Sequence, residues 1–193
     1  MAGNKVSDRK YSAAAVGDKL DRFLKSVLAK GHFRVDYEIT DANPRPDDFE
    51  TPDVMVRFSG SDVDLLLANR AEVMLALEHL TLEVLGVSSE DHSRICFDAN
   101  DYRLLRIEEL RLSAVTAAEK VKRTGVPFRF NPMNSRERRV IHLALRNETE
   151  VRSESAGAGP GRQVVVYPAG MASLPEGPAP APPMRGRSRG ARR

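Results

Sequence analysis

The chain has 193 residues, 41% of them hydrophobic, and its 30 Lys and Arg against 27 Asp and Glu give a formal net charge of +3. This length allows one large or two small domains, and the single cysteine, Cys96, excludes an intrachain disulfide framework and a cysteine-based metal site. The N-terminus lacks the apolar segment of a signal peptide and no apolar run approaches the roughly 20 residues of a membrane span, so we expect a cytoplasmic protein without membrane insertion.

A first unit is predicted from the hydrophobic periodicity of residues 12–124. Apolar side chains at helical spacing predict helices at residues 12–30, 63–67, 74–85 and 102–124. Alternating apolar and polar side chains predict strands at residues 33–40, 54–58 and 94–98. We expect the first two strands to be antiparallel neighbours. Ala68-Asn69-Arg70-Ala71 interrupts the second helical pattern, and Gly125 ends the long last helix.

A second, smaller unit is predicted after Gly125. Strands are expected near residues 126–130, 150–155 and 163–167, with a helix at 134–147. Asn134 is a favourable N-cap for this helix, and Glu137 can complete a capping box. From residue 169 the chain is rich in Pro and then in Arg and Gly, a composition that cannot bury a core, so residues 169–193 are predicted to be a disordered tail. Such a tail is either a solubilising end or an arm that tethers RNA.

The charges are unevenly distributed along the chain. Residues 1–119 hold 15 basic and 22 acidic residues, whereas residues 120–152 hold 9 basic and 3 acidic ones. Attraction to phosphate groups follows local charge, so a polyanion partner is expected at the C-terminal half.

The helix at 134–147 carries the principal candidate site. Arg138 and His142 lie one turn apart, with Arg146 a further turn on and Arg139 beside them. Arginine offers bidentate donors to phosphate, and histidine can hydrogen-bond or stack on a base. A solvated basic face explains the spacing equally well. His142 lacks a second histidine or a carboxylate partner nearby in sequence, which argues against acid–base catalysis. The predicted nucleic-acid-binding residues are Arg138, His142, Arg139, Arg146, Arg136 and Arg129.

The run from Pro132 to Leu145, with residues 151–155 and 163–166, resembles the R-3-H domain, named for an arginine and a histidine separated by three residues. On this match Arg138 and His142 are the named pair. Residues 97–103 and the helices before them resemble the KH domain that precedes R-3-H in the bacterial Jag proteins, also called KhpB or SpoIIIJ-associated proteins. The resemblance implies an α+β fold with an N-terminal arm (1–11), a type II KH-like domain with a long connecting helix (12–125), an R-3-H domain (126–168) and the tail (169–193).

The same resemblance implies that the protein binds single-stranded RNA, or single-stranded DNA, as an RNA chaperone or post-transcriptional regulator. It also implies a small KH-only partner protein. No nucleotide-binding or metalloprotease pattern appears and the histidines at 32, 79 and 92 are scattered, so neither a cofactor nor a metal is predicted. A phosphodiester-cleaving enzyme centred on His142 is the least favoured class.

The KH-like unit departs from its family at the loop that should bind nucleic acid. KH domains use Gly-x-x-Gly there, so that the backbone can approach phosphates, whereas this chain has Ala68-Asn69-Arg70-Ala71. Two methyl groups are expected on the contact surface, in an acidic segment, with Arg70 as a remaining phosphate contact. A structural role, or pairing as a homodimer or with a small KH protein, is therefore favoured over RNA binding for this unit. The alternative function is a protein-interaction adaptor.

Overall fold

The computed structural model describes residues 9–44 and 49–173, which form two compact units divided between Arg106 and Ile107. The structure is mixed α and β, as predicted. None of the helices in the described part of the chain is long and apolar enough to cross a membrane.

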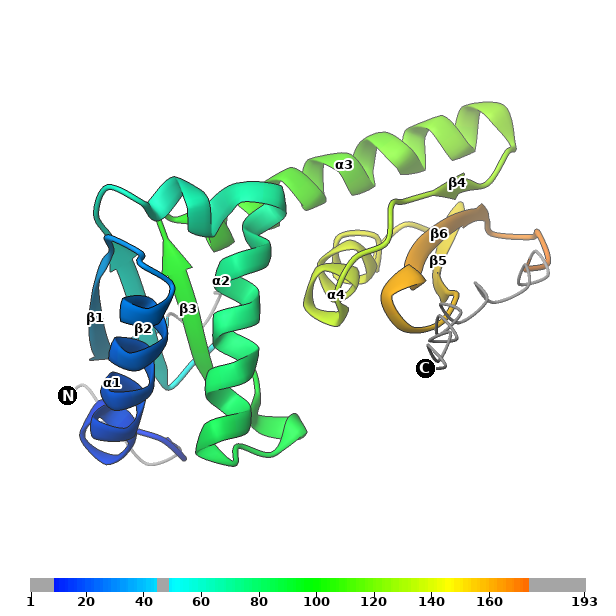
Figure 1. The fold of residues 1–193 in the computed structure, drawn as a ribbon. Helices are drawn as coiled ribbons and strands as arrows, with labels where there is room; N and C mark the ends of the chain where they lie inside the picture. The colour runs from blue at the N-terminus through cyan, green and yellow to red at the C-terminus, as the bar shows by residue number, and fades with distance from the viewer. Residues whose placement is uncertain (1–8, 45–48, 174–193) are drawn as a thin grey trace, which may run out of the picture. The chain divides into compact units, whose positions relative to one another are not determined.

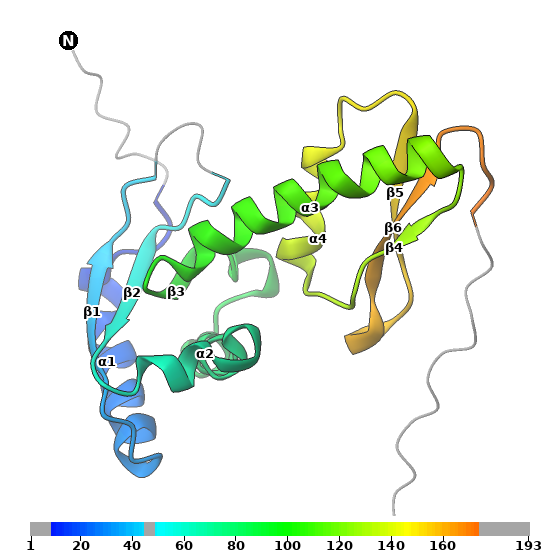
Figure 2. The same ribbon diagram turned by 90° about the horizontal axis from the view of Figure 1, so that it is seen from above.

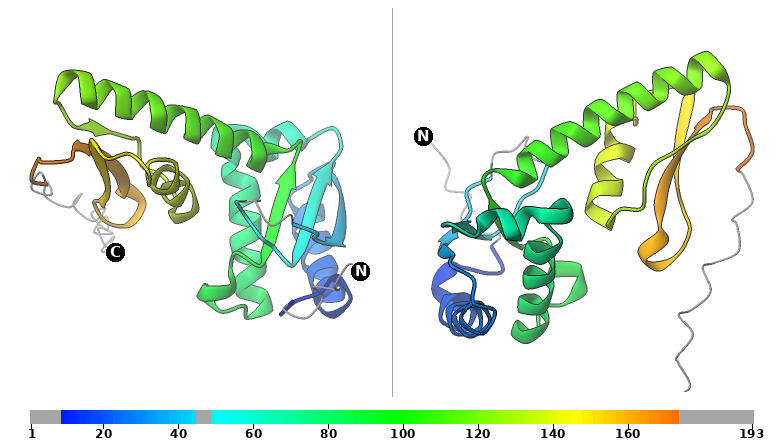
Figure 3. Two further views of the ribbon diagram at one scale, coloured as in Figure 1. Left: turned by 180° about the vertical axis from the view of Figure 1, so that it is seen from behind. Right: turned by 45° about the horizontal axis from the view of Figure 1, so that its top comes forward.

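The first unit follows the expected order of helix, strand, strand, interrupted helix and strand (Figure 1). Its elements are α1 (Ala13–Lys30), β1 (Asp36–Asp41), β2 (Val54–Ser59), α2 (Val63–Leu85), the short 3-10 helix η1 (Ser89–Asp91), β3 (Ile95–Ala99) and the start of α3 (Tyr102–Thr124). The sheet order is β1-β2-β3; β1 and β2 are antiparallel, as predicted, and β2 and β3 are parallel. Helices α1 and α2 pack against each other and against this sheet (Figures 1 and 3).

The core of the first unit forms where the apolar stripe of α1 meets the sheet. Leu20, Leu24 and Leu28, spaced four residues apart, are buried with Val56 and Phe97 of the strands. Burial of each leucine side chain contributes about 1.5–3 kcal/mol. The side chain of Ser12 caps the first turn of α1, so the local signals and the packing specify the same helix.

The break in α2 lies where the sequence predicts it. Ala68 has an extended backbone, and Asn69, Arg70 and Ala71 have left-handed φ values of 52°, 63° and 59°. Left-handed backbone costs an L-residue about 1–2 kcal/mol, so this loop keeps a strained conformation that glycine would adopt more readily. The expectation of two methyl groups on the contact surface is wrong for one of them, because Ala71 is fully buried while Ala68 is exposed. The chain turns Ala71 inward to complete the core.

A buried ionic network joins α2, β3 and the start of α3. Arg103 Nη2 lies 2.5 Å from Glu78 Oε2, Arg103 Nη1 lies 3.0 Å from Glu50 Oε1, and Arg103 Nε donates to the Phe97 carbonyl at 2.6 Å. Glu78 Oε2 also accepts from the Phe97 backbone N–H at 2.8 Å. Burial works to lower the pKa of Arg103, but attraction to Glu78 and Glu50 outweighs it, so the pKa is raised. Arg103 therefore stays charged and fixes three elements at one point.

The second unit contains most of α3, then β4 (Phe128–Arg129), α4 (Ser135–Ala144), β5 (Val151–Ala156), the 3-10 turn η2 (Gly159–Gly161) and β6 (Gln163–Pro168). Its three strands are antiparallel in the order β4-β6-β5, with α4 beside them (Figure 2). Val140 and Ile141 of α4 are buried with Val164 and Val166 of β6. This small core holds the helix that carries the candidate site.

The long helix α3 belongs mainly to the second unit, which begins at Ile107 and not at the expected boundary of residue 125. Ala117 of α3 lies beside Phe128 and Phe130, and Lys122 Nζ lies 2.5 Å from Glu148 Oε2. Periodicity alone shows that a helix is amphipathic but not which neighbouring unit covers its apolar side.

The first residues of the predicted tail are fixed to β5. Arg152 Nη2 donates to the Met171 carbonyl at 2.6 Å, and Ser173 Oγ donates to Glu154 Oε2 at 2.7 Å. The N-terminal arm is described only from Arg9, which donates to the Ala42 carbonyl. The predicted disorder of residues 174–193, and its role in RNA tethering, fall outside the described residues.

Candidate nucleic-acid interface

The start of α4 is fixed by the capping box that the sequence predicts. Asn134 Oδ1 accepts from the Glu137 backbone N–H at 2.9 Å, and Glu137 Oε2 accepts from the Asn134 backbone N–H at 3.2 Å. This cap satisfies backbone N–H groups at the start of the helix and so fixes where it begins. Val140 and Ile141 enter the core, while Arg138 and His142 face strand β5.

Two serines of β5 hold the Arg-x-x-x-His pair. His142 Nδ1 lies 2.8 Å from Ser153 Oγ, and His142 Nε2 lies 3.1 Å from Ser155 Oγ. Arg138 Nη1 donates to the same Ser155 hydroxyl at 2.9 Å. Ser153 and Ser155 alternate along the strand and so share one face of the sheet. Helix and strand together form a polar cluster, which we call the Arg138–His142 cluster and define by Arg138, His142, Ser153 and Ser155.

The imidazole in this cluster favours its neutral form. Burial lowers the pKa of His142, and the nearby positive charge of Arg138 lowers it further. A neutral imidazole donates from one ring nitrogen and accepts at the other, which suits two hydroxyl neighbours that can each do either. His142 therefore acts as a neutral hydrogen-bonding group beside a permanently charged arginine.

Arg138 is short of partners. Its Nε atom is buried and has no hydrogen-bond partner among the described residues. Burial lowers the pKa of Arg138, and repulsion from Arg162 in the turn before β6 adds to the effect. Within residues 9–44 and 49–173, neither arginine forms an ion pair. The positive charge of Arg138 is therefore not balanced by a carboxylate in the described part of the chain, and an anion such as phosphate would stabilise it.

The other predicted residues are distributed more widely. Arg139 is exposed next to Arg138, and Arg136 is half-buried in the first turn of α4. Arg146 is exposed but follows the end of α4 at Ala144, so the helix predicted to extend to residue 147 is shorter and the helical spacing does not place Arg146. Leu145 closes the helix with its N–H bonded to the Ile141 carbonyl.

Strand register separates Arg129 from the cluster. Arg129 is paired with Val165, and Val165 with Glu154, whereas Ser153 and Ser155 are paired with Val166 and Val164. Residues paired across strands share a face, and neighbours along a strand do not. Arg129 therefore lies on the opposite face of the sheet from the Arg138–His142 cluster.

The structure adds Ser153, Ser155 and Arg162 to the candidate site. The two serines alternate in a strand that the sequence marks weakly, and Arg162 lies in a glycine-rich turn. In the sequence, only the alternation of the two serines indicates that their side chains point to the same face of the strand. The approach of Arg162 to Arg138 depends on tertiary structure.

The sequence of this chain matches a known domain family and several known proteins. The R-3-H domain family matches residues 108–168. RNA-binding protein KhpB of Clostridium symbiosum is 35% identical over 150 residues, which cover 77% of this chain and 64% of the relative. RNA-binding protein KhpB of Bacillus subtilis (strain 168) is 31% identical over 115 residues, covering 58% of this chain and 55% of the relative. The chain contains an R-3-H domain and resembles the KhpB proteins.

The matched KhpB proteins are longer than the matched region. The chain covers 64% of the Clostridium symbiosum protein, 55% of the Bacillus subtilis protein and 37% of the Lactiplantibacillus plantarum protein, which is 31% identical over 119 residues. The R-3-H match begins at residue 108, inside α3, and so agrees with the division at Ile107.

Proposed function

We propose that this chain binds single-stranded RNA through its R-3-H domain, as an RNA chaperone or post-transcriptional regulator, without catalysing a reaction. The observation that carries the proposal is the Arg138 guanidinium, which has a buried Nε without a partner among the described residues and lies beside the neutral His142 and its two serines. A phosphate group of the RNA would supply the missing negative charge beside the Arg138 guanidinium.

Two further observations support RNA as the ligand. The relatives are named RNA-binding protein KhpB, and residues 120–152 hold 9 basic against 3 acidic residues. Single-stranded nucleic acid exposes its bases, which histidine and arginine side chains can hydrogen-bond or stack upon. Single-stranded DNA shares these groups and would bind by the same contacts. Single-stranded RNA is present in the bacterial cytoplasm, and we propose that the protein acts there.

The geometry of His142 supports binding and not cleavage. Both ring nitrogens already lie within hydrogen-bond distance of serine hydroxyls, and its lowered pKa disfavours the protonated form that a general acid needs. We expect RNA to remain intact on prolonged incubation with the protein.

The decisive experiment is titration of a fluorescently labelled single-stranded RNA with the full chain at several salt concentrations. Arg138→Glu should weaken binding about tenfold or more, because it removes a charged hydrogen-bond donor and adds repulsion. The control is Arg22→Glu in α1, an exposed arginine of the first unit whose replacement changes the net charge equally. Unchanged affinity in Arg138→Glu, in a variant that melts like the parent, would refute the site.

A second function, protein pairing through the first unit, is favoured by two exposed apolar side chains. Leu80 and Val84 lie one turn apart on α2 and are 51% and 61% exposed. The loop of the same unit has Ala68 and Ala71 in place of glycine, in an acidic segment. We propose that this unit forms a homodimer or pairs with a small KH protein.

A further inference from the structure

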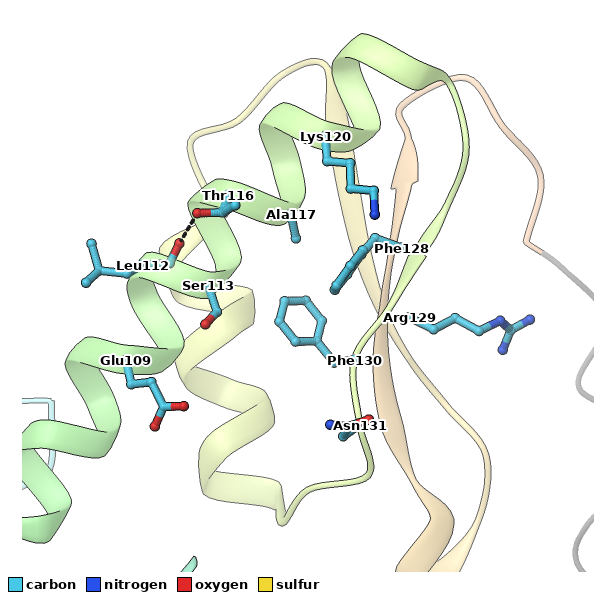
Figure 4. Close-up of a pocket in the computed structure, with 10 residues that line it drawn as sticks. All are labelled: Glu109, Leu112, Ser113, Thr116, Ala117, Lys120, Phe128, Arg129, Phe130 and Asn131. Atoms are coloured by element: carbon cyan, nitrogen blue, oxygen red, sulfur yellow. Dashed lines mark hydrogen bonds between the residues drawn. The ribbon is translucent and has the colours of Figure 1, made fainter.

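A pocket of about 500 Å³ lies within the second unit, between α3 and β4 (Figure 4). Pockets of roughly 300–1,000 Å³ are the size that small ligands and their fragments occupy. The Arg138–His142 cluster does not contribute to it. Its lining includes Glu109, Ser113 and Lys120 of α3 and Phe128, Phe130 and Asn131.

Two aromatic rings form one wall of this pocket. Phe128 and Phe130 both point toward α3, with ring centroids 5.1 Å apart in an edge-to-face arrangement. Phe130 is buried and Phe128 is half-buried, so Phe128 keeps part of its ring accessible. Lys120 Nζ lies 5.4 Å from the centre of the Phe128 ring. An accessible aromatic ring beside a cation is what stacking of a base with a nearby phosphate requires.

Polar groups lie at one end of the pocket. Ser113 of α3 and Asn131, which follows Phe130, both line the pocket (Figure 4). In the described part of the chain, neither side chain is used in a hydrogen bond. Thr116 differs, since its hydroxyl donates to the Leu112 carbonyl at 3.0 Å. A hydroxyl and an amide offer both donors and acceptors, which match the edge of a nucleobase.

Register connects the pocket with the Arg138–His142 cluster. Phe128 is paired with Val166, which is paired with Ser153, and the Phe130 N–H donates to the Val164 carbonyl, opposite Ser155. The two phenylalanines and the two serines therefore share one face of the sheet. Strands β4 and β5 both neighbour β6, so the two sites stand about two strand spacings, ~10 Å, apart across the sheet.

We propose that the pocket between α3 and β4 binds a nucleobase of single-stranded nucleic acid, stacked on Phe128, with Lys120 near its phosphate. The proposal rests on the proposed function and gives the R-3-H domain a second contact, which reads a base in addition to a phosphate. An apolar peptide segment would contact the rings but would gain no electrostatic attraction from Lys120 or from the other basic residues of segment 120–152.

The test compares two ligands of equal length and charge, a short single-stranded RNA and a chain of abasic ribose phosphates. Phe128→Leu keeps an apolar side chain but removes the ring. We expect it to weaken binding of the RNA by about 5-fold to 100-fold and to leave binding of the abasic ligand unchanged. Phe128→Tyr, which restores a ring, should recover the affinity for RNA.

Arg138→Glu separates this proposal from the proposed function, because loss of a phosphate contact should weaken both ligands. If Arg138→Glu weakens both but Phe128→Leu weakens neither, the base pocket is refuted and the phosphate site stands. If only Phe128→Leu weakens RNA binding, the phosphate site is refuted and the pocket stands. Equal affinity of the parent protein for both ligands indicates a different occupant, such as a peptide, and overturns the proposal.

A direct measurement on the unmodified protein covers the case in which Phe128→Leu does not fold. RNA containing 2-aminopurine should lose fluorescence on binding, because the analogue stacks on the ring. Unchanged fluorescence at saturating protein would contradict the base pocket.

Discussion

At the scale of single residues, the Arg138–His142 cluster combines two charge states that depend on each other. Partial burial and, to a smaller extent, the positive charge of Arg138 lower the pKa of His142, which keeps the imidazole neutral next to the guanidinium. A protonated histidine there would add a second buried positive charge without a carboxylate to balance it. The Arg-x-x-x-His spacing therefore provides one cation and one neutral hydrogen-bonding group, not two cations.

This arrangement predicts how the stability of the second unit depends on pH. Because the folded pKa of His142 lies below its ordinary value of about 6.5, the unfolded chain binds the proton more readily. The stability that neutral His142 contributes is fully present above about pH 6.5 and is lost as the pH falls toward the lowered pKa. In urea titrations, the free energy of unfolding of the parent minus that of His142→Gln should become smaller as the pH is lowered from about 8 to about 5.5. A difference that is constant across this range would contradict the prediction.

Sequence reasoning found the residues of α4 but not their neighbours. Arg138 and His142 are recognisable because both lie on one helix with a fixed period. Ser153, Ser155 and Arg162 join them through the pairing of β5 with β6 and the turn between them, contacts that no local pattern encodes. Ala71 shows the same limit, since its burial depends on the core beneath the loop.

At the scale of elements, most helices and strands could be predicted from the sequence. The unit against which α3 packs could not. The capping box of α4, the break in α2 and the antiparallel pairing of β1 with β2 follow from local patterns. The parallel pairing of β2 with β3 and the packing of α3 on β4 depend on long-range contacts. The network around Arg103 also depends on long-range contacts, because it joins residues that are far apart in the sequence.

Breaking this network should destabilise the first unit. Arg103→Met removes the positive charge that balances the buried Glu78 carboxylate. The loss should be about 3–5 kcal/mol in the free energy of unfolding, measured by urea denaturation followed by circular dichroism. The matched control is Arg111→Met, which breaks the exposed pair with Glu108 on the same helix and should cost about 0–1 kcal/mol. Equal effects of the two substitutions would show that burial adds nothing to the Arg103 pair.

At the scale of the whole molecule, acidic and basic residues are distributed unevenly along the chain. Residues 1–119 are acidic in sum, and the loop in α2 has exchanged both glycines for alanine. Arg138 lies in the second unit, near the neutral imidazole. If RNA is held mainly there, the exposed Arg70 of the α2 loop should contribute little to binding.

The salt dependence of RNA affinity tests this expectation with two substitutions of equal charge change. Each phosphate contact to a single strand contributes about 0.7 to the slope of log affinity against log salt concentration. Arg139→Gln on α4 should lower that slope by about 0.7, whereas Arg70→Gln in the α2 loop should leave it unchanged. Both arginines are exposed, so neither substitution removes a buried side chain. A lower slope for Arg70→Gln alone would assign RNA binding to the first unit, and lower slopes for both would show that RNA contacts the two units together.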